Sequence, residues 1–252
     1  MALWQRAGAG GRPEGFVGMS LKVAVITPYV GEPAWMLRQA HESVLAQTYP
    51  CSHVLVADGA IRPEFDGWEA MHLGLSRPQR DFGSTPRFVG SAHAIFLGFD
   101  MVAFLDADNW YRQDHIATMV ALHEHTGASF LTCGRWLAAL DGEVMAKCPI
   151  TNPDRFVDVS CMVYTREAFP LLTYWACMPD YAHEISDRVV LQHHIAAGAR
   201  RAHSPEPTVY YRCGKAGAYR MLGREVPPGV APAPDYGAVF ARWAAEGRPP
   251  LI

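Results

Sequence analysis

The feature that most constrains this sequence is a short apolar run that ends in two aspartates. Residues 101–105 (Met-Val-Ala-Phe-Leu) contain no polar side chain, and Asp106-Ala107-Asp108 follows at once. A run of this length predicts one strand buried on both faces, as in a parallel sheet. Because side chains two residues apart in extended backbone point to the same side, we expect Asp106 and Asp108 to face one cleft.

Two carboxylates at this spacing repel each other, so placing both at a buried strand end is costly without a cation. A hard divalent ion such as Mg²⁺ or Mn²⁺ removes that cost and also holds phosphates. We therefore predict that Asp108 binds a metal directly and that Asp106 contacts it through water or holds a ribose. The alternative is a solvated turn with an aspartate as helix cap. The position directly after a buried strand favours the metal.

The length and composition of the chain limit the classes of protein to which it can belong. It has 252 residues, half of them hydrophobic, which suits one sizeable α/β domain, alone or with a small appendage. Its 22 basic and 25 acidic residues form no basic stripe, which argues against nucleic acid as a partner. The six cysteines form no Cys-x-x-Cys pair, so we expect buried, reduced cysteines in a cytoplasmic protein. No apolar stretch is long enough for a transmembrane segment.

The chain divides into three parts by composition. Residues 1–20 are glycine-rich without a signal-peptide core, and we expect a disordered extension, with Met19 as a candidate start. Residues 21–215 carry the strand and helix patterns of the main domain. Residues 216–252 are rich in Pro and Gly, and we interpret them as a C-terminal lid or tail with one short helix over about 236–246.

The order of elements predicts a parallel sheet. Two strand–helix units fill the first 60 or so residues: a strand at 21–27, a helix from Pro33 to about Gln47, and a second strand at 53–57. Further helices are expected at about 68–73, 90–98, 112–125, 165–172 and 184–197, and further strands at 129–135, 136–140, 143–148 and 156–164.

Three segments carry a resemblance to a known family. The segment FLDADNWY resembles the Asp-x-Asp segment of family 2 glycosyltransferases of the GT-A fold. SVLAQTYP followed by VLVADGA resembles the opening signature of that family, although Ala57 stands where a second aspartate is usual. The resemblance spans roughly residues 21–215. It implies a Rossmann-like, mostly parallel sheet flanked by helices, with a small C-terminal acceptor-side region.

The resemblance also implies an activity. A nucleotide-diphosphate sugar is the expected donor, a carbohydrate or another hydroxyl compound the acceptor, and inversion at the anomeric carbon the expected outcome. A homodimer is a candidate assembly. Three alternatives stay open: a retaining GT-A enzyme, a sugar nucleotidyltransferase, and an inactive module that binds a nucleotide sugar or a partner protein. The nucleotidyltransferase is less favoured because TPYVGEP, after the first strand, holds one glycine instead of a Gly-rich loop.

Polar side chains at the predicted strand ends suit the donor, because ligands of parallel sheets bind beyond the carboxyl ends of strands. Thr27-Pro28-Tyr29 ends the first strand, with Tyr29 placed to stack on a base, and Asp58 ends the second. In the resembled family an aspartate at the place of Asp58 contacts the nucleobase. The alternatives are a core tyrosine and a plain Asp-Gly turn. Arg87 corresponds to a basic residue near the donor sugar or diphosphate, or else is a surface arginine.

A general base is expected on another element, across the sugar from the metal. The family has an acidic pair where this chain reads HEISDRVVLQHH, and we predict Asp187 as the base, with Glu184 as the second candidate. The helix terminus and Arg188 should keep the carboxylate of Asp187 ionised. The alternative is plain helix capping. Asp158 is the reserve candidate.

Two weaker candidates complete the site. His203 could serve as a further metal ligand, as a distant histidine does in some GT-A enzymes. A loose basic group could close over the diphosphate as a lid, although solvated loop charges are the simpler interpretation. The group consists of Arg212, Lys215, Arg220 and Arg224.

Overall fold

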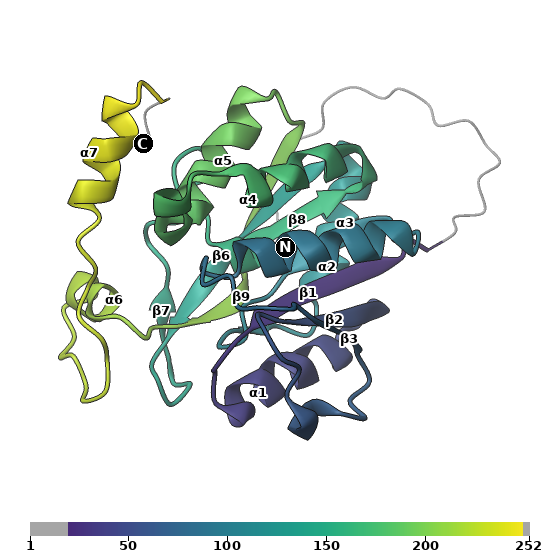
Figure 1. Cartoon of the computed structure of the whole chain (residues 1–252), viewed down its shortest axis with the longest axis horizontal. Helices are drawn as coiled ribbons and strands as arrows, with labels where there is room; N and C mark the ends of the chain where they lie inside the picture. The colour runs from purple at the N-terminus through teal and green to yellow at the C-terminus, as the bar shows by residue number, and fades with distance from the viewer. Residues whose placement is uncertain (1–19, 249–252) are drawn as a thin grey trace.

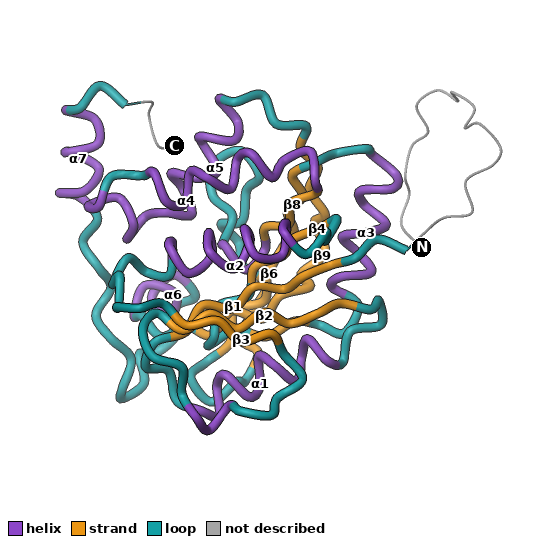
Figure 2. Tube along the Cα trace, turned by 45° about the vertical axis from the view of Figure 1, so that its right-hand side comes forward, coloured by secondary structure: helices purple, strands orange, loops and turns teal. Residues whose placement is uncertain are grey.

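The computed structural model describes residues 20–248, and these form one nine-stranded sheet with helices on both faces. The strand order is β3-β2-β1-β4-β8-β6-β9-β5, with β7 paired to β6. Helices α2, α4 and α5 lie over one face, and α1 lies over the other (Figures 1 and 2). The predicted α/β fold is therefore confirmed.

The first half of the sheet is parallel throughout. It contains β1 (Val23–Tyr29), β2 (Cys51–Ala57), β3 (Met71–Gly74) and β4 (Met101–Phe104), linked by α1 (Ala34–Leu45), the short helix η1 (Pro63–Phe65) and α2 (Ser84–Phe96). Helix α2 packs very closely on this half at Gly90. A Cβ atom there would lie 2.6 Å from a methyl group of Ile26 and 2.8 Å from one of Val56.

The second half of the sheet is mixed. Strand β6 (Phe130–Ala138) pairs in parallel with β9 (Arg201–Arg212) and antiparallel with β7 (Val144–Lys147) and β8 (Met162–Thr165). Strand β8 is also antiparallel to β4, and β5 (Trp110–Tyr111) is antiparallel to β9. Strands β6 and β9 therefore run in the same direction as β4. The carboxyl ends of β1, β2, β4, β6 and β9 consequently lie at one edge of the sheet.

The remaining helices are mostly short. They are α3 (His115–Thr126), α4 (Tyr174–Cys177), α5 (Ser186–Ala196), α6 (Ala216–Met221) and α7 (Gly237–Ala245), with 3₁₀ turns η2 (Val159–Cys161), η3 (Arg166–Thr173) and η4 (Asp180–Ile185). The predicted helix at about 236–246 is confirmed by α7. Trp243 of α7 is part of the main hydrophobic core, and Tyr219 of α6 packs with Leu137 and Cys213. The C-terminal segment thus packs on the main domain.

Several predicted elements were wrong. The segment 68–73 is not a helix, because β3 begins at Met71 as the edge strand. The two strands expected at 129–140 are the single strand β6. The strand expected at 156–164 begins only at Met162, and the helix expected at 165–172 is a 3₁₀ helix containing Pro170. Strand β9 was missed because Pro205 and Pro207 interrupt its pattern; its register shifts there.

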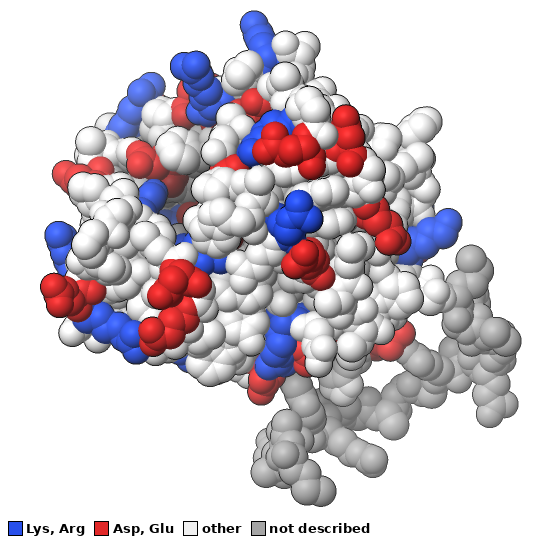
Figure 3. Space-filling view, turned by 90° about the horizontal axis from the view of Figure 1, so that it is seen from below, with Lys and Arg blue, Asp and Glu red and all other residues white. Residues whose placement is uncertain are grey.

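Four further findings concern the termini, the helices, the cysteines and the surface charges. The expected N-terminal extension lies outside the described residues except for Ser20. Within residues 20–248, no helix is both long and apolar enough to cross a membrane. Four of the six cysteines are buried, Cys51 is half-buried and Cys177 is exposed. Acidic and basic side chains are interspersed on the face that Figure 3 shows.

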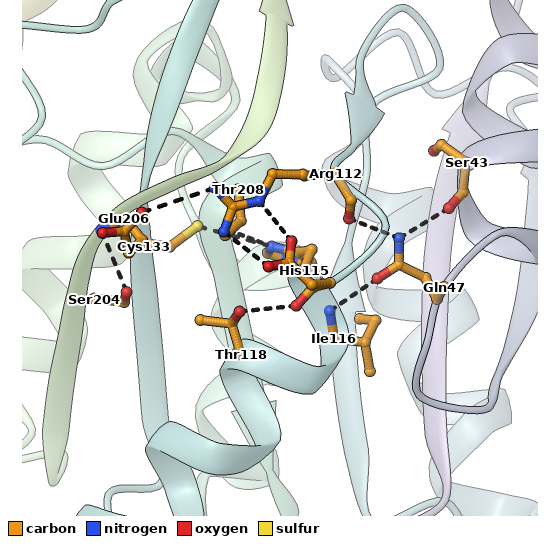
Figure 4. Close-up of polar contacts among 11 residues, drawn as sticks. Ser43, Gln47, Arg112, His115, Ile116, Thr118, Cys133, Ser204, Glu206 and Thr208 are labelled. Carbon is orange, nitrogen blue, oxygen red and sulfur yellow. Dashed lines mark hydrogen bonds and ion pairs between the residues drawn. The ribbon is translucent and has the colours of Figure 1, made fainter. Parts of the chain in front are cut away.

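A polar network holds the segment that follows β4 and β5 in place (Figure 4). The Gln47 amide nitrogen donates to the carbonyl oxygens of Ser43 and Arg112, at 2.9 Å each, and its amide oxygen accepts from the N–H of Ile116 at 2.9 Å. Gln47 therefore satisfies one of the free N–H groups at the start of α3. On the other side, His115 hydrogen bonds to the Thr208 hydroxyl at 2.7 Å. The segment between β5 and α3 is thus fixed to the end of α1 and to β9.

Candidate functional site

A cavity of about 460 Å³ opens at the sheet edge where the parallel strands end. Almost all the predicted strand-end residues line it. The lining consists of Pro28, Tyr29, Val30, Glu32, Asp58, Arg80, Phe82, Gly83, Arg87, Asp106, Ala107 and Asp108. Thr27 is the exception: its hydroxyl hydrogen bonds to the buried His53 ring at 2.8 Å, beneath the cavity wall. We name this space the donor cavity.

Arg87 and Asp106 form an ion pair in the wall of the donor cavity. Arg87 is only 4% exposed, which rules out the surface arginine that was the alternative interpretation. A second nitrogen of its guanidinium donates to the carbonyl of Phe82 at 2.8 Å, and the group lies 5.3 Å from the ring centre of Trp175. The pair holds α2 against the end of β4.

Of the two aspartates in the turn, Asp106 forms an ion pair with Arg87, and Asp108 forms none with the described residues. Its pKa is raised to about 7, first by burial and then by the nearby carboxylates of Asp106 and Asp158. A bound cation would stabilise the ionised form of such a carboxylate. Within the described residues, however, no set of three or more His, Cys, Asp or Glu side chains could hold a metal ion. Asp106 and Asp108 fit a metal that takes its remaining oxygen ligands from water and substrate.

Asp58 and Tyr29 are both engaged with the protein. The two carboxylate oxygens of Asp58 accept the backbone N–H groups of Gln79 at 2.7 Å and Arg80 at 3.0 Å. The ring of Tyr29 is 2% exposed, lies edge-on to Phe65 and hydrogen bonds through its hydroxyl to His72 at 2.5 Å. Asp58 therefore anchors the segment after β3, and stacking by Tyr29 on a base stays a prediction.

Sequence reasoning missed Arg80 and Phe82, which lie between β3 and α2. Both line the donor cavity, and both have positive φ angles, 58° and 56°, although neither is glycine. The segment around them was weakly patterned in the sequence. Ser76, Pro78, Asp81 and Gly83 were local signals of a turn, but none of them indicated a site.

Arg212 was a candidate member of a basic lid, with a solvated loop charge as the simpler interpretation, and the structure corrects both. It is 2% exposed at the end of β9, with its guanidinium 4.8 Å from the ring centres of both Trp35 and Trp110. It donates to the carbonyls of Asp108 at 3.0 Å and Leu140 at 2.5 Å, and its backbone N–H donates to the Asn109 side chain. Arg212 is therefore a fixed brace behind the aspartate turn.

A second cavity, of about 270 Å³, lies beside the mixed half of the sheet. We name it the acceptor cavity. It contains Asp187, Glu184 and Asp158, which sequence analysis proposed for the base and acceptor side. Its walls also include Arg135, Ile150, Phe156, Arg188, Tyr211, Lys215, Met221 and Tyr236. Lys215 is the one member of the predicted lid in this wall, whereas Arg224 lies 3.7 Å from Glu143 in an ion pair.

The charges of the acceptor cavity centre on a buried ion pair. A guanidinium nitrogen of Arg135 lies 2.5 Å from one carboxylate oxygen of Asp158, and the other carboxylate oxygen accepts the N–H of Ser160 at 3.0 Å. Asp187 begins α5 and accepts the N–H of Arg188 at 2.7 Å. Its pKa is nevertheless raised to about 6, first by burial and then by Asp158. Arg188 and the N–H group at the start of the helix lower this pKa, as expected, but burial and Asp158 outweigh them.

His203 lies away from this edge. It stands near the start of β9, paired with Thr132 of β6, and its ring hydrogen bonds to the Thr132 hydroxyl at 2.9 Å. The strand runs from there to Arg212 at the aspartate turn, so the two ends of β9 lie at opposite edges of the sheet. His203 is therefore not brought to the predicted metal position.

The chain has the GT-A fold, as its similarity to two solved structures shows. S. aureus TarS, residues 1–349 in complex with UDP, aligns with a TM-score of 0.57 at 14% identity, over 80% of this chain and 63% of that one. The mannosyltransferase PcManGT from Pyrobaculum calidifontis, in complex with GDP-Man and Mn²⁺, aligns with a TM-score of 0.54 at 16% identity, over 80% of this chain and 60% of that one.

The limits of this likeness are clear. This chain spans less than two thirds of each of those structures, and 38% of the longer TarS structure. At these identities the likeness establishes the fold alone. The sequence matches no protein-family model and no curated protein.

Proposed function

We propose that this chain is a metal-dependent glycosyltransferase. It would move a sugar from a nucleotide-diphosphate sugar to an acceptor hydroxyl, with inversion at the anomeric carbon. One observation carries the proposal: the aspartate turn lies between the two cavities. Asp106 lines the donor cavity and donates its N–H to the Ser160 hydroxyl at 3.1 Å, and the N–H of Ser160 donates to Asp158, which lines the acceptor cavity. A sugar bound at this turn would be open to a nucleophile from the acceptor side.

The donor cavity supports binding of a nucleoside diphosphate. Asp58 and the Pro28–Tyr29 strand end would enclose the base, and Arg87 would face the diphosphate or the sugar. Asp108 would hold Mn²⁺ or Mg²⁺ directly, with Asp106 contacting the ion through water or holding the ribose. When bound, the metal would neutralise charge that develops on the departing diphosphate. The structural neighbours fit this donor class, since their complexes contain UDP, UDP-GlcNAc, or GDP-Man with Mn²⁺.

The acceptor cavity supports base catalysis by Asp187. The acceptor oxygen would form a bond to the anomeric carbon as the bond from that carbon to the diphosphate oxygen breaks. The proton of the acceptor hydroxyl would pass to the Asp187 carboxylate, and the nucleoside diphosphate would leave with the bonding electrons. A pKa of about 6 leaves Asp187 largely ionised at neutral pH and makes it more basic than an ordinary carboxylate. Glu184, in the same cavity, is the second candidate.

An assay of donor turnover tests this proposal. The purified chain is incubated with a panel of nucleotide-diphosphate sugars, with and without Mn²⁺, and release of nucleoside diphosphate is followed along with the anomeric configuration of the product. We expect metal-dependent release and an inverted product. Retention of configuration would favour the retaining alternative. Binding of a nucleotide sugar without release of nucleoside diphosphate, with every sugar acceptor tried, would favour the inactive nucleotide-sugar module.

A further inference from the structure

The segment between β3 and α2 holds an unusual backbone conformation at the mouth of the donor cavity. Arg80 and Phe82 have φ angles of 58° and 56°, and Gly83 follows with a φ of 80°. Positive φ is natural for glycine but rare and strained for a bulky residue such as phenylalanine. Strained residues of this kind persist only where surrounding contacts hold them, and they cluster at ligand sites.

The contacts that hold this segment come from the site itself. Asp58 accepts the N–H groups of Gln79 and Arg80, which fixes the backbone just before Phe82. Arg87, which pairs with Asp106, donates to the carbonyl of Phe82 at 2.8 Å. The peptide unit after Phe82 and the one before Arg80 are therefore tied to groups of the donor cavity.

The result of this conformation is an aromatic ring that faces the cavity. Phe82 lines the donor cavity and is 60% exposed, although burying a phenyl ring in a core is favourable. The other aromatic residue of this wall, Tyr29, is only 2% exposed and is held by His72 and Phe65. Phe82 is thus the ring in this wall whose face is available to a ligand.

We propose that Phe82 is the platform on which the nucleobase of the donor stacks, an inference that rests on the proposed function. An aromatic face stacks on the flat face of any base, whereas phosphate oxygens are repelled by its negative quadrupole. The position agrees: the segment is fastened to Asp58, the residue predicted at the base. Arg87 ties the same segment to Asp106 of the aspartate turn, which is predicted to take the metal and the diphosphate. Because stacking is tolerant of base identity, Phe82 supplies affinity and leaves base selection to polar groups such as Asp58.

Titration calorimetry with UDP, GDP and inorganic pyrophosphate, each in the presence of Mn²⁺, tests the platform. Phe82→Ala should weaken the binding of both UDP and GDP roughly 5- to 150-fold, the range found for loss of one base–aromatic stack. Pyrophosphate, which has no base, should bind as it does to the wild type. Phe82→Tyr should restore nucleotide binding. Phe96→Ala is the matched control, because Phe96 is 85% exposed at the far end of α2.

A glycine variant separates stacking from backbone strain. Phe82→Gly should lose nucleotide affinity as Phe82→Ala does, yet melt at a higher temperature than Phe82→Ala, because glycine accepts the positive φ. Equal nucleotide affinity of Phe82→Ala and wild type would overturn the platform while leaving the proposed function intact. An equal loss of pyrophosphate binding in Phe82→Ala would also overturn it. Failure of the wild type to bind either nucleotide would overturn the proposed function and the platform together.

Discussion

The donor and acceptor cavities are built from the chain in different ways. The donor cavity is lined by residues between Pro28 and Asp108, at the ends of neighbouring parallel strands. The acceptor cavity gathers residues from Arg135 to Tyr236, out of strands, 3₁₀ turns and the C-terminal segment. The donor cavity follows from the sheet itself, because parallel strands bring their carboxyl ends together. The acceptor cavity depends on contacts between segments far apart in the sequence.

The two cavities nevertheless share one electrostatic arrangement. Each has an arginine–aspartate pair, part-buried for Arg87–Asp106 and buried for Arg135–Asp158. Each also has one further aspartate whose pKa is raised, Asp108 to about 7 and Asp187 to about 6. The paired arginine neutralises one carboxylate and leaves the other in need of positive charge. In our account a metal ion satisfies that need at Asp108, whereas a proton from the acceptor satisfies it at Asp187.

The largest effect is expected at Asp187. Asp187→Asn keeps the shape of the side chain and removes the base, so turnover should fall by roughly 10²- to 10⁴-fold while donor affinity stays nearly unchanged. The acidic limb of the wild-type rate profile, expected near the Asp187 pKa of about 6, should disappear. Steady-state kinetics with calorimetry of donor binding provide the measurement. A large loss in Glu184→Gln in place of Asp187→Asn would move the base to Glu184.

A change at Asp58 should act on the donor side alone. Asp58→Ala removes the acceptor for the N–H groups of Gln79 and Arg80 and the predicted contact with the base. Losing a buried hydrogen bond to a charged group costs about 1.5–3 kcal/mol, so nucleoside diphosphate binding should weaken by about one to two decades. The KM for the acceptor should not change. A donor-bound structure with the base far from Asp58 would contradict this assignment.

The pH dependence of stability should distinguish the two aspartates. Both have folded pKa values above the ordinary value of 3.8, so these two groups bind more protons in the folded chain than in the unfolded chain between about pH 4 and pH 7. Their contribution to stability should therefore fall as the pH rises through this window, and without metal the melting temperature of the wild type minus that of Asp108→Asn should be larger at pH 5.5 than at pH 8. Saturating Mn²⁺ should remove the Asp108 part of this loss and leave the Asp187 part. Identical pH profiles with and without Mn²⁺ would contradict the difference between the cavities.

The smallest effect is expected from the packing beneath the donor cavity. Gly90→Ala places a methyl group against Ile26 and Val56 and should lower the free energy of unfolding by about 1–3 kcal/mol. Gly31→Ala is the control, because no atom lies within 4 Å of its added Cβ. Thermal or urea unfolding of both variants gives the comparison. A Gly90→Ala variant as stable as the control would mean that α2 can shift on the parallel half of the sheet without loss of stability.

Much of the donor side could be predicted from the sequence. The apolar run before Asp106 and the strand ends at Tyr29 and Asp58 are local patterns, and the parallel-sheet rule brings them together. Phe82 and Arg80 could not be predicted, because their exposure and positive φ depend on Asp58 and Arg87, which come from other elements.

Less of the acceptor side could be predicted. Behind the aspartate turn, Arg212 ends a strand interrupted by two prolines, and its burial between Trp35 and Trp110 arises only from tertiary packing. The pKa of Asp187 was expected to be low from its neighbours in the chain. It is raised because burial and Asp158, both consequences of tertiary structure, outweigh Arg188.

The most direct test of the account is the Mn²⁺ dependence of nucleotide binding at Asp108. Titration calorimetry of UDP and GDP is performed with and without Mn²⁺ on the wild type, on Asp108→Asn and on Asp66→Asn, a control in which an exposed carboxylate is removed. The account predicts that Mn²⁺ strengthens binding to the wild type and to Asp66→Asn, and that Asp108→Asn binds equally weakly with and without the metal while melting as a folded protein. A full Mn²⁺-dependent gain in Asp108→Asn would contradict the account.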